Sequence, residues 1–157
     1  AGQELATQVR RLVNAGAKHV VVTGTYDLGK TPWATAISQT SLLNDASSRF
    51  NEGLLVNIVD LGANVLYVDA AYYVNLYTSS PGSYSFDNAT TPVCTSVDAG
   101  NGIGIGTGQV NSALCTTATL LPSANQNKYV FADAVYLTPS AHRQLGDYAY
   151  DRLRARW

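Results

Sequence analysis

The sequence predicts an α/β fold in which helices cover both faces of a parallel sheet. Two short apolar runs, "HVVVT" at 19–23 and "NVLYVDA" at 64–70, are typical of buried strands and lie on either side of a helical pattern. A third run, "KYVFAD" at 128–133, precedes the last helical pattern. Strands that alternate with helices favour a parallel sheet. The 157 residues are enough for one domain with a hydrophobic core.

The first two helical patterns each lead into an apolar run. In "QELATQVRRLVNA", residues 3–15, the apolar side chains recur at helical spacing, and Gly16 follows as a C-terminal stop. The second pattern covers residues 33–61 and is clearest in "LLNDASSRFNEGLLVNIVDLG", which ends in Gly62 as its stop. These two elements are predicted to be helices that pack on the sheet.

The last helix is predicted to begin at Pro139, with Thr138 as its N-cap. It continues through "SAHRQLGDYAYDRLRARW", where arginines gather toward the C-terminal end that the helix dipole makes favourable for cations. The run at 128–133 is therefore predicted to be a third strand that leads almost directly into this helix.

Residues 78–128 interrupt the alternation with a long irregular segment rich in Ser, Gly, Thr, Asn and Pro. Such a long insertion is usually functional or pinned in place. It holds both cysteines, Cys94 and Cys115. The pair predicts a disulfide formed in an oxidising compartment, and two free thiols are the alternative.

The composition excludes several kinds of partner. The net charge is -1 and only 13% of the residues are charged, so a nucleic-acid footprint is absent. No C-x-x-C or Cys/His cluster predicts a metal, and no cofactor is expected. No apolar run reaches the roughly 18 residues that span a membrane. A surface rich in Ser, Thr, Asn and Tyr favours an exported protein.

One motif points to a different function. "GTYDLGKTP", residues 24–32, matches the phosphate-loop pattern G-x-x-x-x-G-K-[ST] from Gly24 to Thr31, and Asp69 ends the second apolar run as a magnesium ligand would. However, Pro32 lacks an N–H and disfavours a helical Thr31. Asp27 would also face the phosphates. Nucleotide binding is thus an alternative of low rank.

The segment 131–153, "FADAVYLTPSAHRQLGDYAYDRL", resembles the last conserved block of GDSL (SGNH) esterases and lipases, F-A-D-x-x-H-P-T-x-x-G-H. The matching residues are Phe131, Ala132, Asp133, Thr138 and His142. Upstream, "DLGKTP" looks like the family's D-L-G-x-T-P loop, which offers another explanation for the phosphate-loop match. The resemblance covers nearly the whole chain.

The resemblance implies a three-layer α/β/α sandwich with a parallel sheet, flavodoxin-like in outline. It also implies hydrolysis of a carboxylic ester or lipid through an acyl-serine, without a cofactor. The chain is most similar to the esterases exported as passenger domains of outer-membrane autotransporters. That likeness predicts a secreted or cell-surface protein of a Gram-negative bacterium, attached to the membrane only through a separate barrel domain.

Two departures from the family pattern matter. The G-D-S block that carries the family's nucleophile is absent, as are the two blocks that complete its oxyanion hole. Residues 1–157 therefore resemble the C-terminal half of one such domain. We expect an open sheet edge that a missing N-terminal segment or self-association covers, and no activity from this chain alone.

The second departure concerns the triad. Asp133 holds the family's acid position, but Tyr136 stands where the catalytic His belongs. A phenol ordinarily loses its proton at about pH 10 and is a poor base at neutral pH. His142 matches a second, non-catalytic His of the family, and it is the remaining candidate for a base in place of Tyr136, although a packing role is favoured. His19 begins a strand at the edge away from the site loops. A degenerate, non-catalytic module for binding or surface display is the main alternative.

Overall fold

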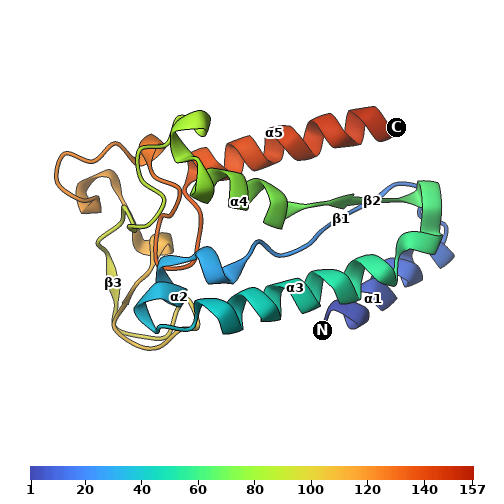
Figure 1. The fold of residues 1–157 in the computed structure, drawn as a ribbon, viewed down its shortest axis with the longest axis horizontal. Helices are drawn as coiled ribbons and strands as arrows, with labels where there is room; N and C mark the ends of the chain where they lie inside the picture. Colours follow the sequence, from blue (N-terminus) through green and yellow to red (C-terminus); the bar gives the residue numbers. More distant parts are fainter.

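The computed structural model describes residues 1–157, and it forms an α/β fold (Figure 1). The sheet at its centre is a parallel pair of strands, β1 and β2. Figure 1 shows this pair between a layer that contains α1 and α3 and a layer that contains α4 and α5. The elements are α1 (Gly2–Asn14), β1 (Val20–Thr23), α2 (Pro32–Ala36), α3 (Thr40–Val56), β2 (Val65–Val68), α4 (Ala70–Ser79), β3 (Val97–Asp98), β4 (Gln109–Val110) and α5 (Pro139–Arg156).

One hydrophobic core lies between the sheet and the layer of α1 and α3. Its buried members are Ala6, Val9, Val22, Leu54, Ile58, Leu61 and Val65. Helix α1 begins close against α3, because a Cβ atom at Gly2 would collide with the backbone carbonyl oxygen of Phe50. The glycine therefore permits the approach that buries Ala6 and Val9.

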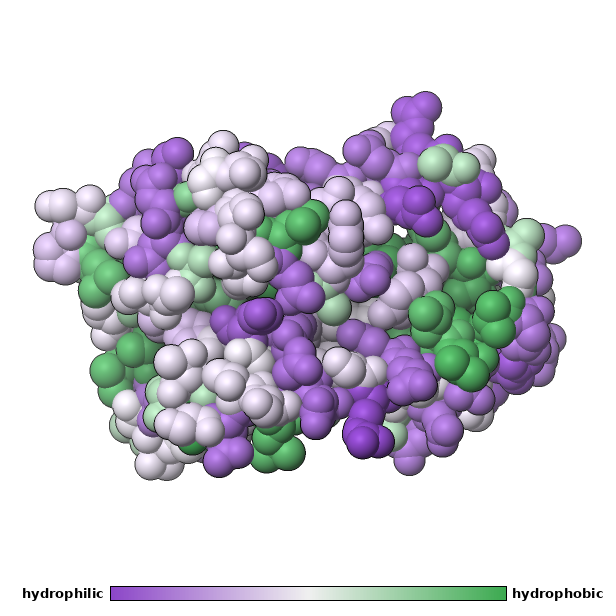
Figure 2. All heavy atoms as spheres, in the orientation of Figure 1, coloured by the Kyte–Doolittle hydropathy of each residue, from purple (hydrophilic) through white to green (hydrophobic).

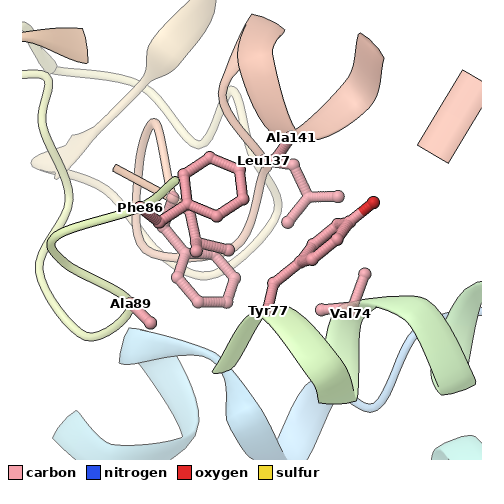
Figure 3. Close-up of a cluster of buried hydrophobic side chains, with 8 residues drawn as sticks. Val74, Tyr77, Phe86, Ala89, Leu137 and Ala141 are labelled. Atoms are coloured by element: carbon pink, nitrogen blue, oxygen red, sulfur yellow. The ribbon is translucent and has the colours of Figure 1, made fainter. Parts of the chain in front are cut away.

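A second core lies on the side of α4 and α5, beneath the irregular part of the chain. It contains Val74, Tyr77, Phe86, Ala89, Val130, Phe131, Leu137 and Ala141. Figure 3 shows Val74 and Tyr77 of α4 directed toward Phe86, Leu137 and Ala141. The segment that carries the predicted acid, around residues 130–137, is thus anchored by its own apolar neighbours.

The prediction of a third strand at 128–133 is wrong. These residues form only isolated bridges, from Tyr129 to Asn88 and from Phe131 to Leu137. Their backbone groups bond the irregular segment 87–94, for example through the Val130 N–H and the Asn88 carbonyl oxygen at 2.9 Å. Because that neighbour is itself irregular, no continuous ladder forms.

The pattern at 33–61 forms two helices rather than one. Helix α2 ends at Ala36, and Ser38 adopts a positive φ of 55° before α3 begins. The helix boundaries predicted at Gly16 and Thr138 are confirmed. The end predicted at Gly62 is wrong, because α3 already ends at Val56 and Gly62 lies at a kink within a separate 3-10 segment, Val59–Asn64. Gly16 and Gly62 have positive φ values of 103° and 57°, and Thr138 is the N-cap of α5.

The irregular segment begins after Ser79 and contains short 3-10 turns and the two-residue strands β3 and β4. The predicted disulfide is present. Cys94 and Cys115 are bonded with their Cα atoms 5.9 Å apart. None of the helices is both long and apolar enough to cross a lipid bilayer.

Candidate functional site

The candidate site forms where two loops meet, one after β1 and the other before α5. The hydroxyl of Tyr26, in the first loop, donates to the Val135 carbonyl oxygen at 2.6 Å. The Trp33 N–H, at the start of α2, donates to the Ala134 carbonyl oxygen at 2.9 Å. These bonds fix the loop of residues 133–138 against the carboxyl end of β1, the edge where α/β proteins place their sites.

Asp133 is the centre of this arrangement, and its side chain is completely buried. Its Oδ1 accepts from the N–H groups of Val135 at 2.9 Å and Tyr136 at 2.7 Å. Its Oδ2 accepts from the Ser112 N–H at 2.9 Å. Three backbone donors compensate the carboxylate for the water that it lost on burial.

The turn that follows Asp133 brings Tyr136 beside it. The Ala132 N–H donates to the Tyr136 carbonyl oxygen at 2.8 Å and closes the turn. Immediately after the turn, the Thr138 hydroxyl accepts from the Ala141 N–H at 3.2 Å and donates to the Tyr129 carbonyl oxygen at 2.7 Å. The turn is therefore held by its own carboxylate and by the cap of α5.

Tyr136 is 47% exposed, and its hydroxyl makes no hydrogen bond within the chain. Tyr26 lies beside the same turn, because its hydroxyl donates to the Val135 carbonyl oxygen. The pKa of Tyr26 is raised above its ordinary value by burial first, then by the negative charge of Asp133 and by Tyr136. The structure thus places Asp133, Tyr136 and Tyr26 in one cluster.

His142 lies apart from this cluster. It is exposed on the first turns of α5 and lines a cavity of about 240 Å³ together with Ser112 and Leu137. Neither Asp133 nor Tyr136 lines that cavity, and His142 makes no hydrogen bond to either. His19 lies at the opposite end of β1, where it stacks on Trp157 with the ring centres 4.4 Å apart.

The phosphate-loop interpretation of Gly24–Thr31 is wrong, because the loop's N–H groups are already bonded inside the protein. The N–H groups of Thr25 and Leu28 donate to side chains of α3, Asn51 Oδ1 and Ser47 Oγ. That of Gly29 donates to the Asp27 carboxylate at 2.8 Å. A phosphate needs such donors free and convergent, so this loop contains no cradle.

Two residues that contact this cluster, Tyr26 and Ser112, are not predicted by the sequence. Tyr26 stands just before "DLGKTP", but nothing local indicates that its hydroxyl reaches Val135. Ser112 lies in the irregular segment, 21 positions before Asp133. Each contact is a consequence of tertiary structure, and no spacing in the sequence signals it. No group of three or more His, Cys, Asp or Glu side chains is placed to hold a metal ion.

Residues 1–149 match the family of GDSL-like lipases and acylhydrolases. The chain belongs to this family.

Two of the curated relatives of this GDSL-like chain are named as GDSL esterase/lipases. A GDSL esterase/lipase of Arabidopsis thaliana is 30% identical over 145 residues, 86% of this chain and 37% of the relative. Another from the same plant is 27% identical over 161 residues, 94% of this chain and 41% of the relative. An uncharacterized protein from the trpE–trpG intergenic region of Pseudomonas putida is 27% identical over the whole chain and 25% of its own length. The chain thus spans well under half the length of these relatives.

Membership gives the cluster at Asp133 a chemical context, because the family is named for ester-cleaving enzymes. In a serine hydrolase, a buried carboxylate orients the histidine that activates the nucleophile. In this GDSL-like chain the buried carboxylate is that of Asp133. The exposed side chain that follows it in the turn, at Tyr136, is a phenol instead of an imidazole.

Proposed function

We propose that residues 1–157 are the C-terminal part of a carboxylic-ester hydrolase of the GDSL type, which acts through an acyl-serine. The observation that carries this proposal is the burial of Asp133 with three backbone donors, at the carboxyl edge of a parallel sheet. Asp133 holds the acid position, and Tyr136 holds the position of the base. The substrate is an ester or a lipid.

The nucleophile, in this proposal, comes from a segment outside residues 1–157. No G-D-S sequence occurs in the chain, and the relatives are more than twice as long as the part that it matches. A second strand could also pair with β1, since β1 is bonded only to β2. This free edge supports the expected partner, which is the remainder of the same domain.

The surface beside β1 fits such a partner. Val21 of β1 is 45% exposed. Figure 2 shows hydrophobic surface gathered over the half of the molecule in which Figure 1 places β1 and β2. A groove of about 400 Å³ also runs between β1 and α5, lined by His19, Val21, Leu153, Arg154 and Trp157. A strand added at β1 would bury this apolar surface, whereas self-association through the same edge is the alternative.

A non-catalytic binding or display module is the second candidate, and Tyr136 favours it. A phenol exchanges protons poorly at neutral pH, and losing a triad base lowers turnover by several powers of ten. The three amides on Asp133 also leave its carboxylate few free acceptor positions. In this candidate, Asp133 is a structural anchor for the turn.

Export to the cell surface of a Gram-negative bacterium completes the proposal. The disulfide between Cys94 and Cys115 supports passage through an oxidising compartment. Attachment to the outer membrane as an autotransporter passenger is our inference from the sequence resemblance.

Replacing Tyr136 in the natural full-length protein separates the two candidates. Tyr136→His should raise the kcat for p-nitrophenyl butyrate by at least about a hundredfold, because imidazole restores general-base catalysis. Tyr136→Phe is the matched control, since it removes only a hydroxyl that makes no hydrogen bond within the chain. Equal, negligible turnover by all three proteins would reject the hydrolase proposal and leave the binding module.

A further inference from the structure

We propose that the cavity beside the first turns of α5 binds a small neutral molecule with an apolar body and one oxygen that forms hydrogen bonds. The cavity has a volume of about 240 Å³. An apolar cavity of about 150 Å³ is known to hold benzene, so this one has room for a ring or a short chain with a polar group. Its lining consists of Val93, Cys94, Ser112, Cys115, Leu120, Gln126, Ala132, Leu137, Pro139 and His142.

The walls of the cavity are mostly apolar and are fixed in place. Cys94 and Cys115 form one wall as a disulfide. The Val93 and Cys94 N–H groups donate to the carbonyl oxygens of Phe131 and Ala132, at 3.1 and 3.0 Å. A cavity that is formed before the ligand arrives binds without the entropic cost of ordering its walls.

Three polar side chains reach the cavity without a partner. Ser112 Oγ, the Gln126 amide and the His142 imidazole make no hydrogen bond within the chain, although all three line the space. Other hydroxyls of the irregular segment are satisfied. Those of Thr95 and Ser96, for instance, bond Thr119 at 2.8 Å. A mostly apolar lining with a few polar groups free to bond a ligand is the usual composition of a small-molecule site.

The surroundings favour a neutral ligand. No Asp, Glu, Lys or Arg lines the cavity. Asp133 does not line the cavity, and the Oδ2 of its carboxylate accepts from the Ser112 N–H. A charged molecule would therefore lose its water without gaining an opposite charge. A carbonyl or hydroxyl oxygen, in contrast, would find donors in Ser112, Gln126 and His142.

This site is separate from the proposed ester chemistry, since neither Asp133 nor Tyr136 lines the cavity. Ser112 is the link between them, because its N–H holds Asp133 while the residue also lines the cavity. The proposal holds whether or not the protein hydrolyses esters.

Titration with benzyl alcohol, followed by ¹H–¹⁵N NMR of residues 1–157, tests the proposal. We expect saturable shifts of the Ser112 and His142 backbone amides and of the Gln126 side-chain amide. Toluene, which lacks the oxygen, and benzoate, which is charged, should each bind at least about fivefold more weakly. No saturable shift up to about 20 mM benzyl alcohol, well above a Kd of about 1 mM, would overturn the proposal. Tighter binding of benzoate than of benzyl alcohol would contradict the proposal that the cavity prefers a neutral ligand.

A pair of variants locates the binding. Leu120→Trp fills the cavity and should abolish the shifts, whereas Leu114→Trp places the same ring at a 50% exposed position that does not line it. Ala132→Leu fills the space from another element and replaces Leu120→Trp if that variant loses its dispersed spectrum. Equal shifts in the filled and control variants would place the binding elsewhere and reject the site.

Discussion

The chain contains two loops of the same design, "DLGKTP" at 27–32 and "DAVYLTP" at 133–139. Each begins with a buried Asp and ends in a buried Thr that caps a helix, with Pro at the first helical position. They differ in what holds the carboxylate. Asp27 accepts from the Gly29 N–H at 2.8 Å and from Asn44 Nδ2 of α3 at 2.7 Å. Asp133 depends on Ser112, in the irregular segment.

The difference shows how one local design can serve two purposes. In the first loop, the carboxylate is bonded to the regular helix α3 and to its own loop. Both partners precede the irregular segment in the chain. The second is anchored partly to an irregular segment that the Cys94–Cys115 disulfide restrains. The geometry at Asp133 and Tyr136 is therefore tied to the insertion, whereas the geometry at Asp27 is not.

Removing each carboxylate should have the largest effect and should separate the loops. We expect Asp133→Ala to lower the free energy of unfolding by about 4 kcal/mol, because three backbone N–H groups lose their shared acceptor. Asp27→Ala should cost about 2 kcal/mol, because fewer bonds are lost. Urea unfolding followed by circular dichroism measures both. A larger loss at Asp27 would contradict the comparison.

Removing the disulfide should act on one loop only. The paired replacement Cys94→Ala and Cys115→Ala should lower the free energy of unfolding by about 3 kcal/mol, because the unfolded chain regains the freedom of the closed loop. Amide hydrogen exchange should accelerate at Ser112 and Tyr136 but not at Gly29. Equal acceleration in both loops would mean that the insertion does not selectively hold Asp133.

The two capping threonines provide a test in which the loops should behave alike. Thr31 and Thr138 each accept from a helix N–H at 3.2 Å and donate to a carbonyl oxygen, of Leu28 at 2.6 Å and of Tyr129 at 2.7 Å. We expect each Thr→Ala change to cost about 2 kcal/mol. Thermal unfolding of the two variants side by side measures this. A loss confined to one of them would show that the shared design is only apparent.

Two tyrosines, the half-buried Tyr26 and the buried Tyr77, should give smaller effects of opposite sign. Tyr26 bridges the loops through its hydroxyl, so Tyr26→Phe should cost about 1 kcal/mol. The Tyr77 hydroxyl is buried with no partner, so Tyr77→Phe should be neutral or should stabilise the protein by about 1 kcal/mol. Urea unfolding at pH 7 distinguishes them, and destabilisation by Tyr77→Phe would mean that its hydroxyl has a partner.

Tyr26 and Tyr77 also predict that the free energy of unfolding decreases at alkaline pH. The pKa values of Tyr26 and Tyr77 are both raised, chiefly by burial. As the pH rises, the unfolded chain therefore loses these protons before the folded protein does. The free energy of unfolding is unaffected below about pH 10 and decreases above it. Each tyrosine should contribute a loss of about 1 kcal/mol between pH 10 and 11. The double variant Tyr26→Phe/Tyr77→Phe should flatten this decline, and an unchanged slope would contradict the assignment.

Local rules predicted the parts of the fold that local chemistry determines. Gly16 and the Thr138–Pro139 pair marked helix boundaries, and the two valine-rich runs formed β1 and β2. Gly62 did not end α3, which stops at Val56. The strand predicted at 128–133 failed, because a strand needs a partner and its neighbour at 87–94 is irregular. For the candidate site, the sequence pointed to Asp133 and Tyr136, whose roles stay predictions. It did not point to Ser112 or Tyr26, whose contacts depend on distant parts of the chain.

The central claim is that residues 1–157 supply the acid-bearing loop of a serine esterase and that the nucleophile comes from elsewhere in the natural protein. Treatment with a serine-reactive fluorophosphonate, followed by intact mass measurement, tests it most directly. The account predicts that residues 1–157 alone remain unlabelled, whereas the full-length protein takes up one label, on a serine outside this range. A label on any serine within residues 1–157 would contradict the claim.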